Sequence, residues 1–108
     1  MKKSQCYRAC RDKNKEIIFC LTDSFLEVIT DDQGNSFRIH FHRIGDAWSA
    51  TEETTGARCV PCIYYTRREC FDDAYRIRGE YKRLLSTKSC IDLMERLKKF
   101  KEKQNEKS

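Results

Sequence analysis

The spacing of the apolar residues changes at Thr66, and this change constrains the fold more than any other feature of the chain. Before Thr66, apolar residues recur at every second position, which is the period of a half-buried strand. After Thr66, they recur at every third or fourth position, which is the period of a helix packed on one face. The sequence therefore predicts an α+β fold, in which a small antiparallel sheet of about four or five strands is followed by two C-terminal α-helices packed on one face.

Five segments are expected to form strands, and turn residues separate most of them. They are residues 16–21, 25–30, 36–44, 47–51 and 58–65. Residues 22–24 and 31–35 are expected to be turns, the second because Gly34 and Asn35 tolerate positive φ. The last strand contains Pro61, which has no N–H for a ladder, so this strand is expected at an edge or with a bulge.

The start of the helical region is marked by Thr66, followed three residues later by Glu69, which is the pattern of a capping box. This helix is expected to run to Leu85, and Ser89 is expected to open a second one. The second helix would bury a stripe consisting of Cys90, Leu93, Met94, Leu97 and Phe100. We expect a basic N-terminal arm over residues 1–15, a single domain over 16–100, and a charged C-terminal tail over 101–108.

The compartment is inferred from two features of composition. No apolar run approaches the roughly 18 residues that span a bilayer, and the basic start has no apolar stretch of a signal peptide behind it. We therefore expect a cytoplasmic protein without a membrane partner. The seven cysteines would be reduced in that compartment, as free thiols or metal ligands, and their odd number argues against a complete disulfide framework.

The net charge of +5 is unevenly distributed. Residues 1–16 carry a net +4, residues 17–66 a net −4, residues 67–85 a net +2 and residues 86–108 a net +3. A uniformly basic nucleic-acid face would not show this pattern. A bipolar surface is as compatible with a protein partner as with a phosphate backbone.

The sharpest short motif is the C-x-x-C pair of Cys59 and Cys62, since two thiolates at a tight turn converge on one tetrahedral zinc ion. Cys6 and Cys10 are the candidates for the other two ligands, and the substitutes are Cys20, Cys70, His40 and His42. A thioredoxin-like redox pair would need a helix directly after the motif. Plain edge-strand residues are the third interpretation. We expect no bound cofactor, with zinc as the alternative.

Two basic sets are candidate contacts for a partner or for nucleic acid. The first is Arg38, His40 and His42, on one face of an expected strand, with Arg43 nearby. Its alternative is the solvated face of a half-exposed sheet. The second follows Thr66 and consists of Arg67, Arg68, Arg76 and Arg83. Arginine interleaved with tyrosine is enriched at binding hot spots, although an amphipathic helix with mixed charge pairs has the same composition.

Catalytic patterns are missing from the sequence. No nucleophile–base–acid set can be named beside the histidines, and none of the four glycines lies in a phosphate-binding loop. We therefore expect a protein that is not an enzyme.

Three short motifs together resemble a layout found in small phage and mobile-element proteins. They are Trp48-Ser49-Ala50-Thr51, Thr55-Gly56-Ala57-Arg58 and Thr66-Arg67-Arg68-Glu69, within residues 36–85. In that layout, a tryptophan-bearing hairpin is followed by a Thr-Gly turn and a capped helix that lies on the sheet. Cys59, Pro61 and Cys62 depart from it. The resemblance implies a phage or plasmid accessory protein, a group that includes the anti-CRISPR inhibitors.

These observations lead to one functional hypothesis and two alternatives. The first is a non-catalytic binding protein from a phage or mobile element that blocks a host nucleic-acid-handling complex, with a host protein or ribonucleoprotein as its partner. The second is a module that binds DNA or RNA directly. The third is a small zinc-binding protein. The sequence does not specify an oligomeric state.

Overall fold

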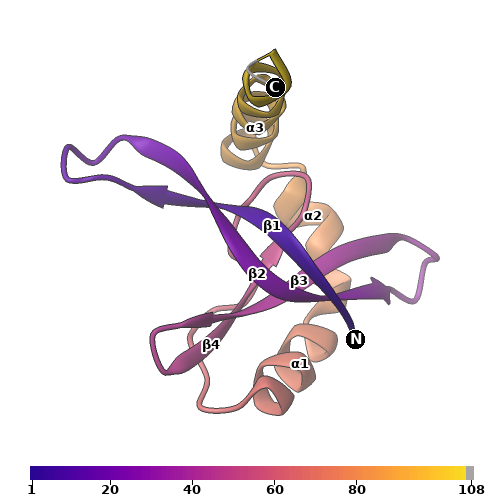
Figure 1. Cartoon of the computed structure of the whole chain (residues 1–108). Helices are drawn as coiled ribbons and strands as arrows, with labels where there is room; N and C mark the ends of the chain where they lie inside the picture. Colours follow the sequence, from indigo (N-terminus) through magenta and orange to yellow (C-terminus); the bar gives the residue numbers. More distant parts are fainter. Residues whose placement is uncertain (107–108) are drawn as a thin grey trace.

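The computed structural model describes residues 1–106 of the chain. Four antiparallel strands lie side by side in chain order: β1 (Lys2–Arg11), β2 (Ile17–Thr30), β3 (Ser36–Ile44) and β4 (Ala47–Glu52). They are followed by the helices α1 (Arg67–Arg76), α2 (Tyr81–Leu85) and α3 (Lys88–Glu106), with the short 3-10 turn η1 (Arg78–Glu80) between α1 and α2. The sheet precedes the helices in the chain (Figure 1), so the predicted α+β class is confirmed.

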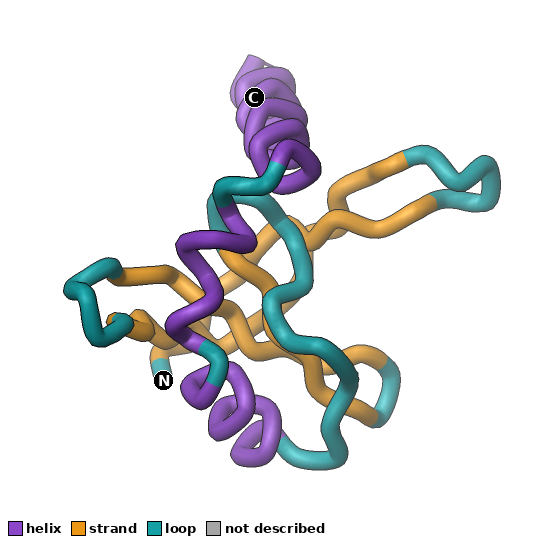
Figure 2. The backbone as a smooth tube through the Cα atoms, turned by 180° about the vertical axis from the view of Figure 1, so that it is seen from behind, coloured by secondary structure: helices purple, strands orange, loops and turns teal. Residues whose placement is uncertain are grey.

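One face of the sheet packs against α1 and α2 and forms the hydrophobic core. Ile39 and Phe41 of β3 are fully buried there, together with Cys70 and Ala74 of α1 and Tyr81 of α2. Seen from behind, these helices lie in front of the strands (Figure 2). The buried Tyr81 hydroxyl donates to the carbonyl oxygen of Ala74 at 2.6 Å, so this phenol is paired inside the core.

The last helix, α3, packs on a different part of the sheet. Its Phe100 ring lies 5.2 Å from the ring centre of Tyr7 in β1 and 5.6 Å from that of Phe19 in β2. Leu97 is buried beside it. The predicted apolar stripe is therefore the packed face of α3, except that Met94 is 41% exposed.

The part of the opposite face around His40 and His42 is enclosed, because the sheet coils. β1 contacts β3 as well as its neighbour β2, and the Ala9 N–H of β1 donates to the Gly56 carbonyl oxygen in the loop after β4, at 2.8 Å. His40 and His42 lie inside this concave face and are 0% and 2% exposed. The interpretation of these histidines as the solvated face of a half-exposed sheet is therefore wrong.

The N-terminal region differs from the prediction in two ways. Residues 1–15 are not an irregular arm, because β1 pairs with β2 over its whole length. An edge strand needs few apolar residues, since its outer side faces water. The predicted turn at residues 22–24 is also wrong, because Asp23 and Ser24 pair with Gln5 and Ser4 and so keep β2 continuous.

The expected fifth strand and the helix boundaries differ as well. Residues 58–65 meet β4 through two isolated bridges, Trp48–Tyr64 and Thr51–Arg58, because Pro61 cannot sustain a ladder. The expected single helix over residues 66–85 is split at η1, which contains the helix-weakening Gly79. The helix α3 continues through the predicted tail to Glu106, and residues 107–108 of that tail lie outside the described part.

None of the helices in residues 1–106 combines the length and the apolar character needed to cross a bilayer.

Candidate functional site

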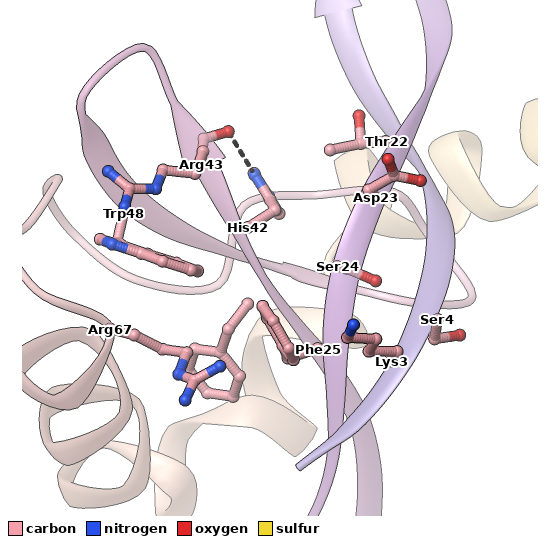
Figure 3. A pocket seen from close by; sticks show the side chains of 11 residues that line it. Lys3, Ser4, Thr22, Asp23, Ser24, Phe25, His42, Arg43, Trp48 and Arg67 are labelled. Atoms are coloured by element: carbon pink, nitrogen blue, oxygen red, sulfur yellow. Dashed lines mark hydrogen bonds between the residues drawn. The ribbon is translucent and has the colours of Figure 1, made fainter.

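The most prominent concave feature is a groove at the point where β2 and β3 separate. Their ladder ends at the pair Phe25–Phe41. Beyond it, the rest of β2 pairs only with β1, while the end of β3 pairs only with β4. The two ribbons diverge and leave a groove of about 750 Å³ between them, which we call the fork groove (Figure 3).

Aromatic rings and cations alternate around this groove. The guanidinium carbon of Arg67 lies 4.3 Å from the ring centre of Phe25 and 5.8 Å from that of Trp48. The guanidinium carbon of Arg43 lies 4.9 Å from the Trp48 ring centre. Lys3 of β1 lines the same groove. Within residues 1–106, neither Arg43 nor Arg67 forms an ion pair, so both retain their charge for a ligand.

Local structure accounts for the position of each arginine. Arg67 is the first residue of α1, because the Thr66 hydroxyl accepts the N–H of Glu69 at 3.1 Å and ends the loop there. This confirms the predicted cap at Thr66. Arg43 lies directly opposite Trp48 in the β3–β4 hairpin, and side chains that face each other across strands make contact. A tight turn at Gly45, whose φ is +59°, sets that register.

A polar network centred on the buried His40 lies beside the groove. The Glu53 carboxylate can only accept, so His40 donates from Nε2 to Glu53 Oε1 at 2.9 Å. On the other side of the ring, Nδ1 of His40 forms a hydrogen bond with the Ser24 hydroxyl at 2.8 Å. Arg38 donates to the other Glu53 oxygen, also at 2.8 Å. Burial acts to raise the pKa of Glu53, but the hydrogen bonds from His40 and Arg38 outweigh it and lower that pKa.

This network has the order of a nucleophile, a base and an acid, which sequence reasoning missed because Ser24 was assigned to a turn. His40 is fully enclosed and Ser24 is 5% exposed. The geometry therefore supports a structural role, in which the network holds β2, β3 and the loop after β4 together at the fork.

His42 is the second buried histidine, and it lines the groove. Burial lowers its pKa, and the nearby charge of Arg8 acts in the same direction, so the ring is neutral at neutral pH. Its Nδ1–H donates to the Arg43 carbonyl oxygen at 3.2 Å, and its Nε2 accepts from the Thr51 hydroxyl at 2.7 Å. His42 therefore adds shape to the groove wall, without a charge.

Most of the other predicted contact residues do not reach the groove. Arg38 is paired with Glu53, and Arg68 with Asp72 on the same helix. Arg76 is paired with Asp73, and Arg83 with Glu80. Of the seven predicted contacts, Arg67 and His42 line the groove. Trp48 and Phe25 were missed, although the Gly45 turn predicts that Arg43 and Trp48 face each other.

The four predicted zinc ligands lie in different surroundings. Cys6 is buried on the concave face, and Cys59 packs against the core. Cys62 is exposed, and Cys10 faces Cys20. Over residues 1–106, no group of three or more His, Cys, Asp or Glu side chains is placed to hold a metal ion. The predicted four-cysteine set is therefore not assembled.

Comparison of the chain with protein-family models, with curated proteins and with solved structures finds no match.

Proposed function

We propose that this chain is a non-catalytic binding protein, and that its fork groove takes single-stranded nucleic acid. The observation that carries the proposal is the cluster of Arg43, Arg67, Phe25 and Trp48 around one groove. Proteins that bind single strands combine a positively charged groove with aromatic rings on which the bases stack. Bases in a duplex already stack on one another, so aromatic rings that line a groove favour an unpaired strand.

The charge around the groove supports the same ligand. Lys3, Arg43 and Arg67 line it, and Arg68 is the next residue of α1. Asp23 also lines the groove, but its carboxylate accepts a hydrogen bond from the Gln5 side chain at 2.9 Å. The volume of about 750 Å³ lies within the range of about 300–1,000 Å³ that is usual for ligand pockets. It suits a few nucleotides, with phosphates against the arginines and bases against the rings.

The experiment is a titration of the full chain into a fluorescein-labelled oligothymidine of about 12 nucleotides, followed by anisotropy, with salt varied between about 50 and 200 mM. The test variant is Arg43→Gln/Arg67→Gln. The matched control is Arg76→Gln/Arg83→Gln, which removes the same charge from two arginines that are paired within the helices.

We expect the test variant to lose at least about tenfold in affinity, and its log–log salt slope to fall by about 0.7 for each lost phosphate contact. The control should bind nearly as the unaltered chain does. Absence of binding at low salt, or equal losses in both variants, would overturn the proposal.

The origin in a phage or mobile element stays a prediction from the resemblance, as does the block of a host nucleic-acid-handling complex. An acidic protein surface is the alternative occupant of the groove. If the oligonucleotide does not bind while an acidic protein captured from host lysate competes for Arg43 and Arg67, that alternative replaces single-stranded nucleic acid.

A further inference from the structure

Two thiols face each other on the β1–β2 hairpin, on the concave face of the sheet. Cys10 pairs with Ile18, and Cys20 pairs with Arg8. Because side chains alternate along a strand, Cys10 and Cys20 point to the same face as diagonal neighbours. Their Sγ atoms are 2.7 Å apart, which is about 0.7 Å longer than a disulfide bond.

The fork explains why these diagonal neighbours approach so closely. In a regular sheet, the Cα atoms of diagonal neighbours are about 7–8 Å apart, and their Cβ atoms are somewhat closer. The outer half of the β1–β2 hairpin is a two-stranded ribbon, because β3 pairs with β2 only over residues 25–30 of β2. This ribbon projects from the rest of the molecule in Figures 1 and 2. Two-stranded ribbons twist more than larger sheets, and the stronger twist shortens one of the diagonals.

Two properties of the surroundings bear on the thiol chemistry of the pair: access for a reagent and nearby charge. Both cysteines are half-buried, so a small reagent has access to them. Burial and the neighbouring Cys20 raise the pKa of Cys10 above its ordinary value, and the positive charge of Arg8 opposes this rise only in part. The Nε atom of Arg8 is buried and has no hydrogen-bond partner within residues 1–106. A guanidinium in this position stabilises the thiolate that thiol–disulfide exchange requires.

We propose that Cys10 and Cys20 form a redox-active dithiol site whose substrate is a small disulfide such as glutathione disulfide. One thiol loses its proton and attacks a sulfur of glutathione disulfide, which releases one glutathione and leaves a mixed disulfide. The second cysteine, as its thiolate, then attacks the protein sulfur of the mixed disulfide and releases a second glutathione. The protein dithiol is oxidised by two electrons, the glutathione disulfide is reduced, and the two thiol protons are carried by the two glutathiones.

The product joins β1 to β2 near the hairpin turn. The cross-link closes a loop in the unfolded chain and lowers the conformational entropy of that state. The folded hairpin therefore becomes more stable relative to the unfolded chain. Because the pair lies away from the rings and cations of the fork groove, the site is independent of the proposed function.

The test uses the unaltered full chain, reduced and then incubated with glutathione disulfide. Remaining thiols are blocked with N-ethylmaleimide, and the tryptic map is read without reduction. We expect the intact mass, measured before the blocking step, to fall by two hydrogens. The tryptic map should contain a fragment of residues 9–11 joined to residues 16–38. The other five cysteines should carry the blocking group. An unchanged mass, a link that involves another cysteine, or a glutathione that stays attached would overturn the proposal.

Two variants test the mechanism. Cys20→Ser lacks the second thiol, so glutathione should stay attached at Cys10 after the same treatment. Cys90→Ser, a control in α3, should form the Cys10–Cys20 link as the unaltered chain does. Equal behaviour of the two variants would also overturn the proposal.

Discussion

The guanidinium of Arg67 lies on the ring of Phe25, with 4.3 Å between the guanidinium carbon and the ring centre. This contact joins the first turn of α1 to β2 across the fork groove, although 42 positions separate the two residues in the chain. A helix cap, a strand and the end of a ladder meet at this contact.

Replacement of Arg67 by lysine separates the two roles of the guanidinium. Lysine keeps the charge but lacks the planar group that lies on a ring and donates in pairs. We expect Arg67→Lys to bind oligothymidine about three- to fivefold more weakly, which corresponds to the loss of an exposed cation–π contact, with the salt slope unchanged. Arg83→Lys is the control. An unchanged affinity would mean that Arg67 acts only as a point charge.

The substitution Glu53→Ala should destabilise the fold, because the fully buried His40 would lose the acceptor for its Nε2–H. The expected loss is about 1–3 kcal/mol of unfolding free energy, measured by urea denaturation at pH 7. Glu95→Ala, on the exposed side of α3, should change stability by less than about 0.5 kcal/mol. Equal losses in the two variants would rule out a role of the network at the fork.

The same carboxylate predicts a dependence of stability on pH. Its pKa is lower in the folded chain than in the unfolded chain, so it contributes fully above the ordinary pKa of a glutamate, about 4.3. The contribution is lost as the pH falls through the lower, folded-state pKa. The stability difference between the unaltered chain and Glu53→Ala should therefore shrink below about pH 4.3. A constant difference between pH 7 and pH 3 would contradict this linkage.

The cysteines should differ in their reactivity toward iodoacetamide under native conditions. Burial raises the pKa of Cys6 to about 11 and that of Cys70 to about 12, and it raises the pKa of Cys59 as well. Cys62 is exposed. At pH 8, mass spectrometry should find Cys62 modified first and Cys6, Cys59 and Cys70 modified only after denaturation. Early modification of Cys70 would contradict its position in the core.

Gly56 should resist substitution more than Gly45 does. Both have a positive φ, +72° and +59°. A Cβ on Gly56 would lie 2.9 Å from the Tyr7 carbonyl oxygen, whereas a Cβ on Gly45 meets open space. We expect Gly45→Ala to cost about 1 kcal/mol and Gly56→Ala to cost about 1–3 kcal/mol more, from crowding of the backbone. Similar thermal midpoints for the two variants would show that the loop moves away from β1 without a penalty.

Ser24 provides a test of the non-catalytic proposal. Its hydroxyl forms a hydrogen bond with Nδ1 of His40, as a catalytic serine does with its base, but the side chain is 5% exposed. A serine-directed fluorophosphonate should therefore leave Ser24 unmodified, as judged by intact mass. Modification of Ser24 that disappears in Ser24→Ala, but persists in Ser4→Ala, would contradict the proposal.

Much of the fold is local, and local signals predicted it. The alternation in residues 36–44 predicted β3, and Thr66 predicted the start of α1, because side-chain period and cap chemistry act within a few residues. The turn at Gly34 predicted the hairpin that joins β2 to β3.

The errors have a common cause, which is that distant partners decided the outcome. Asp23 and Ser24 are typical turn residues, but their pairing with β1 keeps them in a strand. His40 and His42 alternate with apolar residues as a solvated face would, yet coiling of the sheet encloses them. The local sequence around a polar residue does not show which distant segment will pack over it in the fold.

Sequence alone therefore determined the succession of sheet and helices, the alternation that forms β3 and the cap at Thr66. Tertiary structure decided the rest: the early end of the β2–β3 ladder, the approach of Arg67 to Phe25, the network from Ser24 to Glu53 and the meeting of Cys10 with Cys20. The physical reason is that periodicity and capping depend on neighbours in the chain, whereas these contacts depend on how the whole sheet twists and what it encloses.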